Sequence, residues 1–77
     1  MEYDKEKVDQ VVLALFYLTS FTERGVTRAW KRHDWDVMTR LYEKGFISDP
    51  KSKAKSVVLS ESGAKESAQL FRKHFGK

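Results

Sequence analysis

The chain has 77 residues, a length that fits one small domain. Hydrophobic residues make up 40% of it and charged residues 34%, with only 4 Gly and 1 Pro, so collagen-like and low-complexity classes are excluded and disorder is disfavoured. Lys and Arg (15) outnumber Asp and Glu (11), which gives a net charge of +4, and the absence of cysteine excludes a disulfide framework and a cysteine-based zinc site.

Apolar runs are too short to cross a membrane, which takes about 18 residues. The start of the chain, Met-Glu-Tyr-Asp-Lys, does not have the pattern of a signal peptide. We therefore expect a cytoplasmic protein, formed as a single domain over residues 1–77.

The first predicted helix covers residues 4–19, with Asp4 as its N-cap. Residues 11–18 are eight apolar residues in a row, which a strand could also explain, but the helical spacing that begins at Val8 favours a helix. A helix that is apolar on most sides must be covered on most sides, and a short chain covers only part of it. We therefore expect a homodimer whose interface includes Val11, Val12, Leu15 and Leu18.

Residues 21–26 are predicted to be a connector that turns at Gly25. The basic stretch 27–33 fits either one short strand or one helical turn. A second helix is predicted over residues 34–44, because Asp34 can cap its start and Gly45 stands where glycine commonly follows a helix.

Two β-prone runs, residues 46–48 and 55–59, flank a polar stretch with the one proline and predict a β-hairpin. Val57 and Leu59 are expected on one side of this hairpin and Val58 on the other. Ser60 is expected to cap a last helix over about 61–75. The expected buried stripe of that helix consists of Ala64, Ala68, Phe71 and Phe75, with Leu70 beside it. Gly63 lowers helix propensity by about 1 kcal/mol, so we expect close packing where no side chain fits.

Residues 38–47 (MTRLYEKGFI), the charged tip and residues 56–63 (SVVLSESG) together resemble the closing half of bacterial winged-helix domains of the MarR and PadR type. The resemblance covers about 34–75. It implies an α+β, mainly α, winged-helix-like fold in the order helix, short strand, helix, β-hairpin, helix. A full winged helix has two helices before its hairpin, so here the first is either collapsed into residues 21–29 or missing.

The whole chain is also similar to a small bacterial family of domains with no assigned function. The similarity lies in three segments, which are Arg28-Ala29-Trp30-Lys31, Asp34-Trp35-Asp36 and residues 47–59. This resemblance is nearly full length, and it implies no activity.

Positive charge gathers in two segments, 24–32 and 51–55. Lysines two residues apart project to one side of an extended hairpin arm, and such groups contact phosphates. We therefore predict that these segments bind double-stranded DNA. The alternative is that the lysines only solvate a loop and prevent edge pairing. The predicted nucleic-acid contacts are Arg28, Lys31, Arg32, Arg40, Lys51, Lys53 and Lys55.

The second helix is a poor candidate for reading bases, because Asp34 and Asp36 stand at its start and phosphates would repel them. Four aromatic residues near the hairpin could be a platform for stacking single strands, but we interpret them as core, because a small domain needs its large aromatics inside. These residues are Trp30, Trp35, Tyr42 and Phe46.

Catalytic patterns are absent from the sequence: the two histidines, His33 and His74, lie in different elements, and no known catalytic motif occurs. We predict no enzyme activity, no cofactor and no metal. The predicted function is DNA binding or transcription regulation through the hairpin tip and residues 24–32. The alternative is a protein-interaction or dimerisation module that does not bind DNA.

Overall fold

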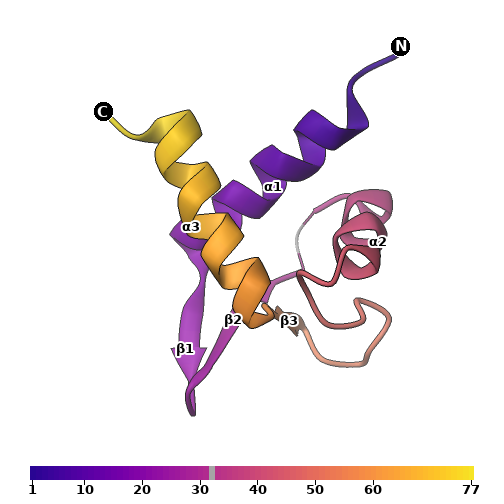
Figure 1. Cartoon of the computed structure of the whole chain (residues 1–77). Helices are drawn as coiled ribbons and strands as arrows, with labels where there is room; N and C mark the ends of the chain where they lie inside the picture. Colours follow the sequence, from indigo (N-terminus) through magenta and orange to yellow (C-terminus); the bar gives the residue numbers. More distant parts are fainter. Residues whose placement is uncertain (32) are drawn as a thin grey trace.

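The computed structural model describes residues 1–31 and 33–77, and over these residues it contains three helices and a three-stranded antiparallel sheet (Figure 1). The predicted α+β class is therefore confirmed. The elements in chain order are α1 (Lys5–Thr19), β1 (Phe21–Glu23), β2 (Val26–Trp30), α2 (Trp35–Glu43), β3 (Ser56–Val58) and α3 (Glu61–Phe75). The strands lie in the order β1-β2-β3.

The three predicted helices are confirmed, each with a boundary within one residue of the prediction. Their first turns are capped by side chains: the Asp4 carboxylate accepts from the amide of Lys7, and the Ser60 hydroxyl accepts from that of Gly63. Asp34 caps α2 in the same way. These local bonds satisfy amide groups that a helix start otherwise leaves without partners.

The connector predicted over residues 21–26 is wrong, because β1 and β2 form a hairpin there. The two-residue turn consists of Arg24 (φ 53°) and Gly25 (φ 78°). Positive φ at both central positions is what a type I′ hairpin turn requires. For residues 27–33 the sequence fitted either a short strand or one helical turn, and residues 27–30 form a strand.

The predicted hairpin of residues 46–48 and 55–59 is present only as one bridge, between Ile47 and Leu59. The main partner of β3 is instead β2, with Ala29 opposite Val57. This pairing places a strand from the first half of the chain in the centre of the sheet, which the linear order of hydrophobic runs did not indicate.

Residues 50–55 form turns and bends, so Lys51, Lys53 and Lys55 do not lie on an extended arm that would project them to one side. The Asp49 carboxylate accepts from the amide of Lys51 (2.9 Å), and the Asp49 carbonyl accepts from the amide of Ser52 (3.2 Å). These two bonds close a turn at the start of the loop. We call residues 49–55 the lysine loop.

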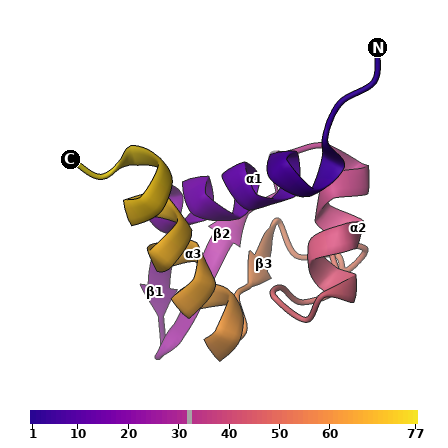
Figure 2. The same ribbon diagram turned by 45° about the horizontal axis from the view of Figure 1, so that its top comes forward.

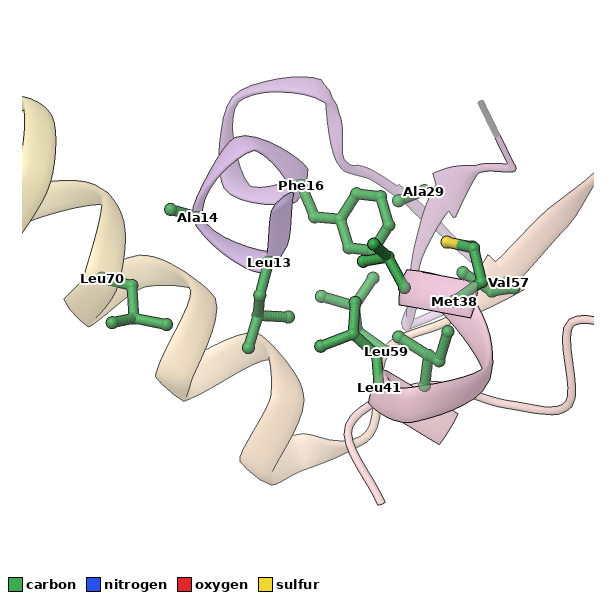
Figure 3. Packing of buried hydrophobic residues seen from close by; sticks show 11 residues of the cluster. Leu13, Ala14, Phe16, Ala29, Met38, Leu41, Val57, Leu59 and Leu70 are labelled. Carbon is green, nitrogen blue, oxygen red and sulfur yellow. The ribbon is translucent and has the colours of Figure 1, made fainter. Parts of the chain in front are cut away.

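The core lies where the three helices and the sheet meet, and Figure 3 shows Leu13, Phe16, Met38, Leu41 and Leu59 gathered at its centre. Figure 2 shows α1 lying above the strands. The inward face of the sheet is formed by Ala29 and Val57, both fully buried. Val57 and Leu59 are buried while Val58 is half-buried, as predicted. The helices and the chain segment before the lysine loop supply Leu13, Ala14, Phe16, Val37, Met38, Leu41, Ile47 and Leu70.

The buried stripe of α3 differs from the prediction. Gly63, Ser67 and Leu70 are buried, whereas Phe75 is exposed and Ala64, Ala68 and Phe71 are half-buried. The small residues face inward because the neighbouring backbone is close. The Ser67 hydroxyl donates to the carbonyl of Leu13 (2.6 Å), and a Cβ at Gly63 would collide with the carbonyl of Phe46. The close packing predicted at Gly63 is thus confirmed.

Candidate functional site

Three of the four aromatic residues that we assigned to the core lie on the surface. Trp30 is 45% exposed, Trp35 is 50% exposed and Tyr42 is 45% exposed, so the prediction is wrong for them. Phe46 is half-buried and packs against the core. The cause is geometric: successive strand residues alternate, so the inward Ala29 turns Trp30 outward.

The exposed tryptophans line one groove, of about 550 Å³. This volume is within the range of small-ligand sites. Trp30 comes from the end of β2 and Trp35 from the first turn of α2, while the lysine loop supplies the remaining wall, including the buried Pro50. The full lining, which we call the Trp–Lys groove, is Trp30, Lys31, Trp35, Pro50, Lys51, Ser52 and Lys55.

Lys31 holds the lysine loop in place. Its Nζ donates to the carbonyl oxygen of Ser52 (2.7 Å) and to the hydroxyl of Ser52 (3.3 Å), and its amide donates to the carbonyl of Lys55 (3.2 Å). Lys51 and Lys55 are exposed. The groove therefore has one lysine that supports its wall and two lysines whose side chains face solvent.

The lining of the groove carries three lysines and no carboxylate. Ion pairs within the described residues join Asp9 to Arg40 and to Lys44, and none of them includes a lysine of the groove. Two nearby carboxylates accept backbone bonds, since Asp34 caps α2 and Asp49 binds the amide of Lys51. The lining itself thus carries positive charge beside two aromatic rings, while the carboxylates of Asp34 and Asp49 stay outside it.

The outer face of the sheet continues this surface. Arg28 lies two residues before Trp30 on β2 and so points to the same side. Its Nη1 donates to the Ser56 hydroxyl (3.1 Å), and the ring of Phe21 lies 5.0 Å from that of Trp30. The structure therefore brings the two basic segments of the sequence, around residue 28 and in the lysine loop, onto one side of the molecule.

Arg40, another predicted nucleic-acid contact, is engaged inside the fold. Its Nε and Nη2 donate to the two carboxylate oxygens of Asp9 at 2.7 and 2.8 Å, and Lys44 lies 3.6 Å from the same carboxylate. The hydrogen bond to Asp9 is the main reason that the pKa of Arg40 is raised. We therefore leave Arg40 out of the candidate site.

The sequence analysis missed Asp9, which is 1% exposed. A signal was present: Asp9, Leu13 and Phe16 have the i, i+4, i+7 spacing of one helical face, and all three are buried. A carboxylate on the buried face of a helix requires a cationic partner, because an unpaired buried charge is costly.

The other predicted contacts are dispersed. Lys53 is exposed in the lysine loop without lining the groove, and Arg32 lies outside the described residues.

The predicted dimer-interface residues Val11, Val12 and Leu15 are half-buried, and Leu18 is 67% exposed.

Residues 1–31 and 33–77 contain neither a cluster of metal ligands nor a membrane-spanning helix. No group of three or more His, Cys, Asp or Glu side chains in that part of the chain is placed to hold a metal ion. No helix there is both long enough and apolar enough to cross a bilayer.

Comparison with known proteins identifies a family described as a domain of unknown function. A model of a domain of unknown function, DUF6429, matches residues 4–77. The uncharacterized protein y4hR of Sinorhizobium fredii is 48% identical over 75 residues, which cover 97% of each chain. No solved structure matches the chain. The chain therefore belongs to the DUF6429 family, a domain of unknown function.

Proposed function

We propose that this domain is a nucleic-acid-binding module that contacts the phosphate backbone through the Trp–Lys groove and the lysine loop. One observation supports this most: three lysines from two distant segments line one groove that no carboxylate lines. A strand end and a loop have been folded against each other to give this arrangement. A loop that only needed solvation would not require Lys31, the residue just after β2, to hold it in place.

Binding of this kind is driven mainly by release of counterions from the phosphates. If the fold is compared with a winged helix, the lysine loop corresponds to the wing. Helix α2 does not serve as a recognition helix, because Asp34 and Asp36 are exposed at its start. We therefore propose binding that depends on the backbone, in a DNA-associated or regulatory role, without readout of a defined base sequence.

The experiment measures fluorescence anisotropy of labelled oligonucleotides at several salt concentrations. With three to four phosphates neutralised, the logarithm of the binding constant should fall with the logarithm of salt concentration with a slope of about −3 for duplex DNA. We expect a dissociation constant of roughly 1–100 μM at physiological salt, as for other binding without sequence preference.

The decisive variant replaces Lys51, Lys53 and Lys55 by Ala. A matched control replaces Lys65, Lys73 and Lys77 by Ala, since these lysines are also exposed but lie in α3 and at the C-terminus. Both variants lower the net charge from +4 to +1. Loss of binding in the first variant alone supports the proposal. Equal losses in both, or no binding by the parent protein even at low salt, would refute it.

A second candidate function is association through the surface of α1. Leu18 is 67% exposed and Tyr17 is 44% exposed at the end of this helix, and Phe75 of α3 is 46% exposed. Exposed apolar side chains that gather on one surface are typical of protein contacts. We propose that the partner is a second copy of this chain. The interface of the homodimer would include Val11, Val12, Leu15 and Leu18. Sedimentation velocity at increasing concentration tests it: a monomer at several hundred micromolar contradicts it.

A further inference from the structure

We infer that the Trp–Lys groove is a stacking site for an unpaired nucleobase, so that the domain prefers single-stranded over double-stranded nucleic acid. This inference rests on the proposed nucleic-acid binding and adds the form of the ligand. It is carried by the two indole rings, which the lysines alone do not explain.

About half of the surface of each tryptophan is left uncovered, although the core itself is closed. Leu13, Phe16, Met38 and Leu41 are each 1% exposed or less, so the core is sealed while Trp30 and Trp35 remain about half exposed. Both indoles nevertheless line the same groove. Two large aromatic surfaces held in one hollow, and left uncovered, are suited to a flat ligand.

The ring of Trp30 is packed against a neighbouring aromatic ring. Trp30 packs against Phe21 with ring centroids 5.0 Å apart and planes tilted by 34°, and Trp35 starts α2 directly after its N-cap Asp34. Pro50 is buried and lines the same groove. Rigid aromatic surfaces lose little conformational entropy when a planar ligand stacks on them.

The charge around the rings selects the ligand. Lys51 and Lys55 are exposed beside the indoles, and no carboxylate lines the groove, so a flat ligand that carries negative charge is favoured. A nucleotide meets both conditions, because its base can stack while its phosphate contacts a lysine. In a duplex the faces of the bases are covered by their neighbours and only the edges are accessible, so a stacking site requires an unpaired base.

The test uses the fluorescence of the protein itself. The chain has two tryptophans, both in the groove, so quenching reports this site directly. Three probes of equal length are titrated: oligothymidylate, the same strand without bases, and a duplex. We expect quenching by oligothymidylate with an affinity at least about 5-fold higher than that for the other two, since stacking of one base contributes roughly 1–3 kcal/mol. A fourth titration uses vesicles of phosphatidylserine and phosphatidylcholine.

Variants separate stacking from charge. Trp35→Ala should weaken binding of oligothymidylate by about 5-fold or more and leave binding of the baseless strand unchanged, while Trp35→Phe should retain most of the affinity. The matched control is Tyr42→Ala, because Tyr42 is on the same helix and equally exposed but does not line the groove. Circular dichroism of each variant checks that it is folded.

The outcomes distinguish this inference from the proposed function. If the lysine variant loses binding but Trp35→Ala does not, phosphate binding stands and the stacking site is refuted. Equal affinity for the strand with and without bases, or tighter binding of the duplex, also refutes stacking. If the vesicles alone quench the tryptophans, both proposals fail and the groove is a membrane contact. If Trp35→Ala does not fold, the comparison of the three probes on the parent protein decides.

Discussion

Cationic side chains cluster in two parts of this molecule, and among the residues that the structure describes a carboxylate pairs with them in only one of the two. Around Asp9, a carboxylate that is 1% exposed accepts two bonds from Arg40 and lies near Lys44. Around the Trp–Lys groove, three lysines line a hollow without a carboxylate. The first group holds α1 to α2 and is satisfied within the fold, whereas the second leaves positive charge facing solvent. Counting basic residues in the sequence treats the two groups alike.

The largest expected effect comes from breaking the inner group. Asp9→Ala should lower the free energy of unfolding by about 3 kcal/mol, because removing one partner of a buried ion pair leaves the other without compensation. Urea denaturation measures this change. For a domain of this size the melting temperature should fall by roughly 10 °C or more.

A double-mutant cycle sharpens this prediction. Asp9→Leu combined with Arg40→Met should be less destabilising than the sum of the two single changes, because the double variant leaves no unpaired charge at this position. Asp4→Ala, which removes an exposed helix cap, should cost only about 1 kcal/mol. If Asp9→Ala costs no more than Asp4→Ala, the inner pair does not stabilise the fold as the comparison requires.

Effects of intermediate size are expected when one positive charge is removed from either group, at Arg40 beside Asp9 or at Lys51 in the groove. Arg40→Met should lower the free energy of unfolding by less than Asp9→Ala does, because Lys44, 3.6 Å from Asp9, still compensates part of its buried charge, and it should leave oligonucleotide affinity unchanged under conditions where the variant is folded. Lys51→Met should do the reverse, with stability within about 0.5 kcal/mol and affinity reduced. Both variants remove one positive charge. A loss of affinity in Arg40→Met as large as that in Lys51→Met would contradict the division into an inner and an outer group.

The smallest effect concerns His33, which lies between β2 and α2 with its ring 5.2 Å from that of Phe16. Burial lowers the pKa of His33, so the folded state binds this proton less readily than the unfolded state does. Its contribution to stability is therefore complete above the ordinary pKa of about 6.5 and is lost as the pH falls through that value toward the lower pKa of the folded state.

Urea denaturation at about pH 7.5 and about pH 5.5 measures this dependence. The loss due to His33 should be less than about 1 kcal/mol, because the side chain is only half-buried, and it should disappear in His33→Gln. His33 does not line the Trp–Lys groove, so oligonucleotide affinity should not follow the loss. An identical pH dependence in His33→Gln would show that another group is responsible.

The helices and their caps could be predicted from the sequence because their determinants are local. Asp4, Asp34 and Ser60 each act on amides within three residues, and Gly45, with φ of 79°, follows α2 as the glycine pattern indicated. Gly63 was likewise predictable, since a glycine inside a helix that has no turn to make indicates close packing.

Tertiary structure decided which strands pair and which side chains the pairing exposes. Ile47 and Leu59 form an antiparallel bridge, as expected of one hairpin. Strand β3 itself pairs with β2, a strand about 28 residues earlier in the chain, because that pairing joins Ala29 to Val57 in the core. The same choice turned Trp30 outward, placed Lys31 against the lysine loop and formed the groove. Which strands pair depends on how all the apolar faces of the helices and strands are buried together. A pattern of neighbouring residues does not contain that information.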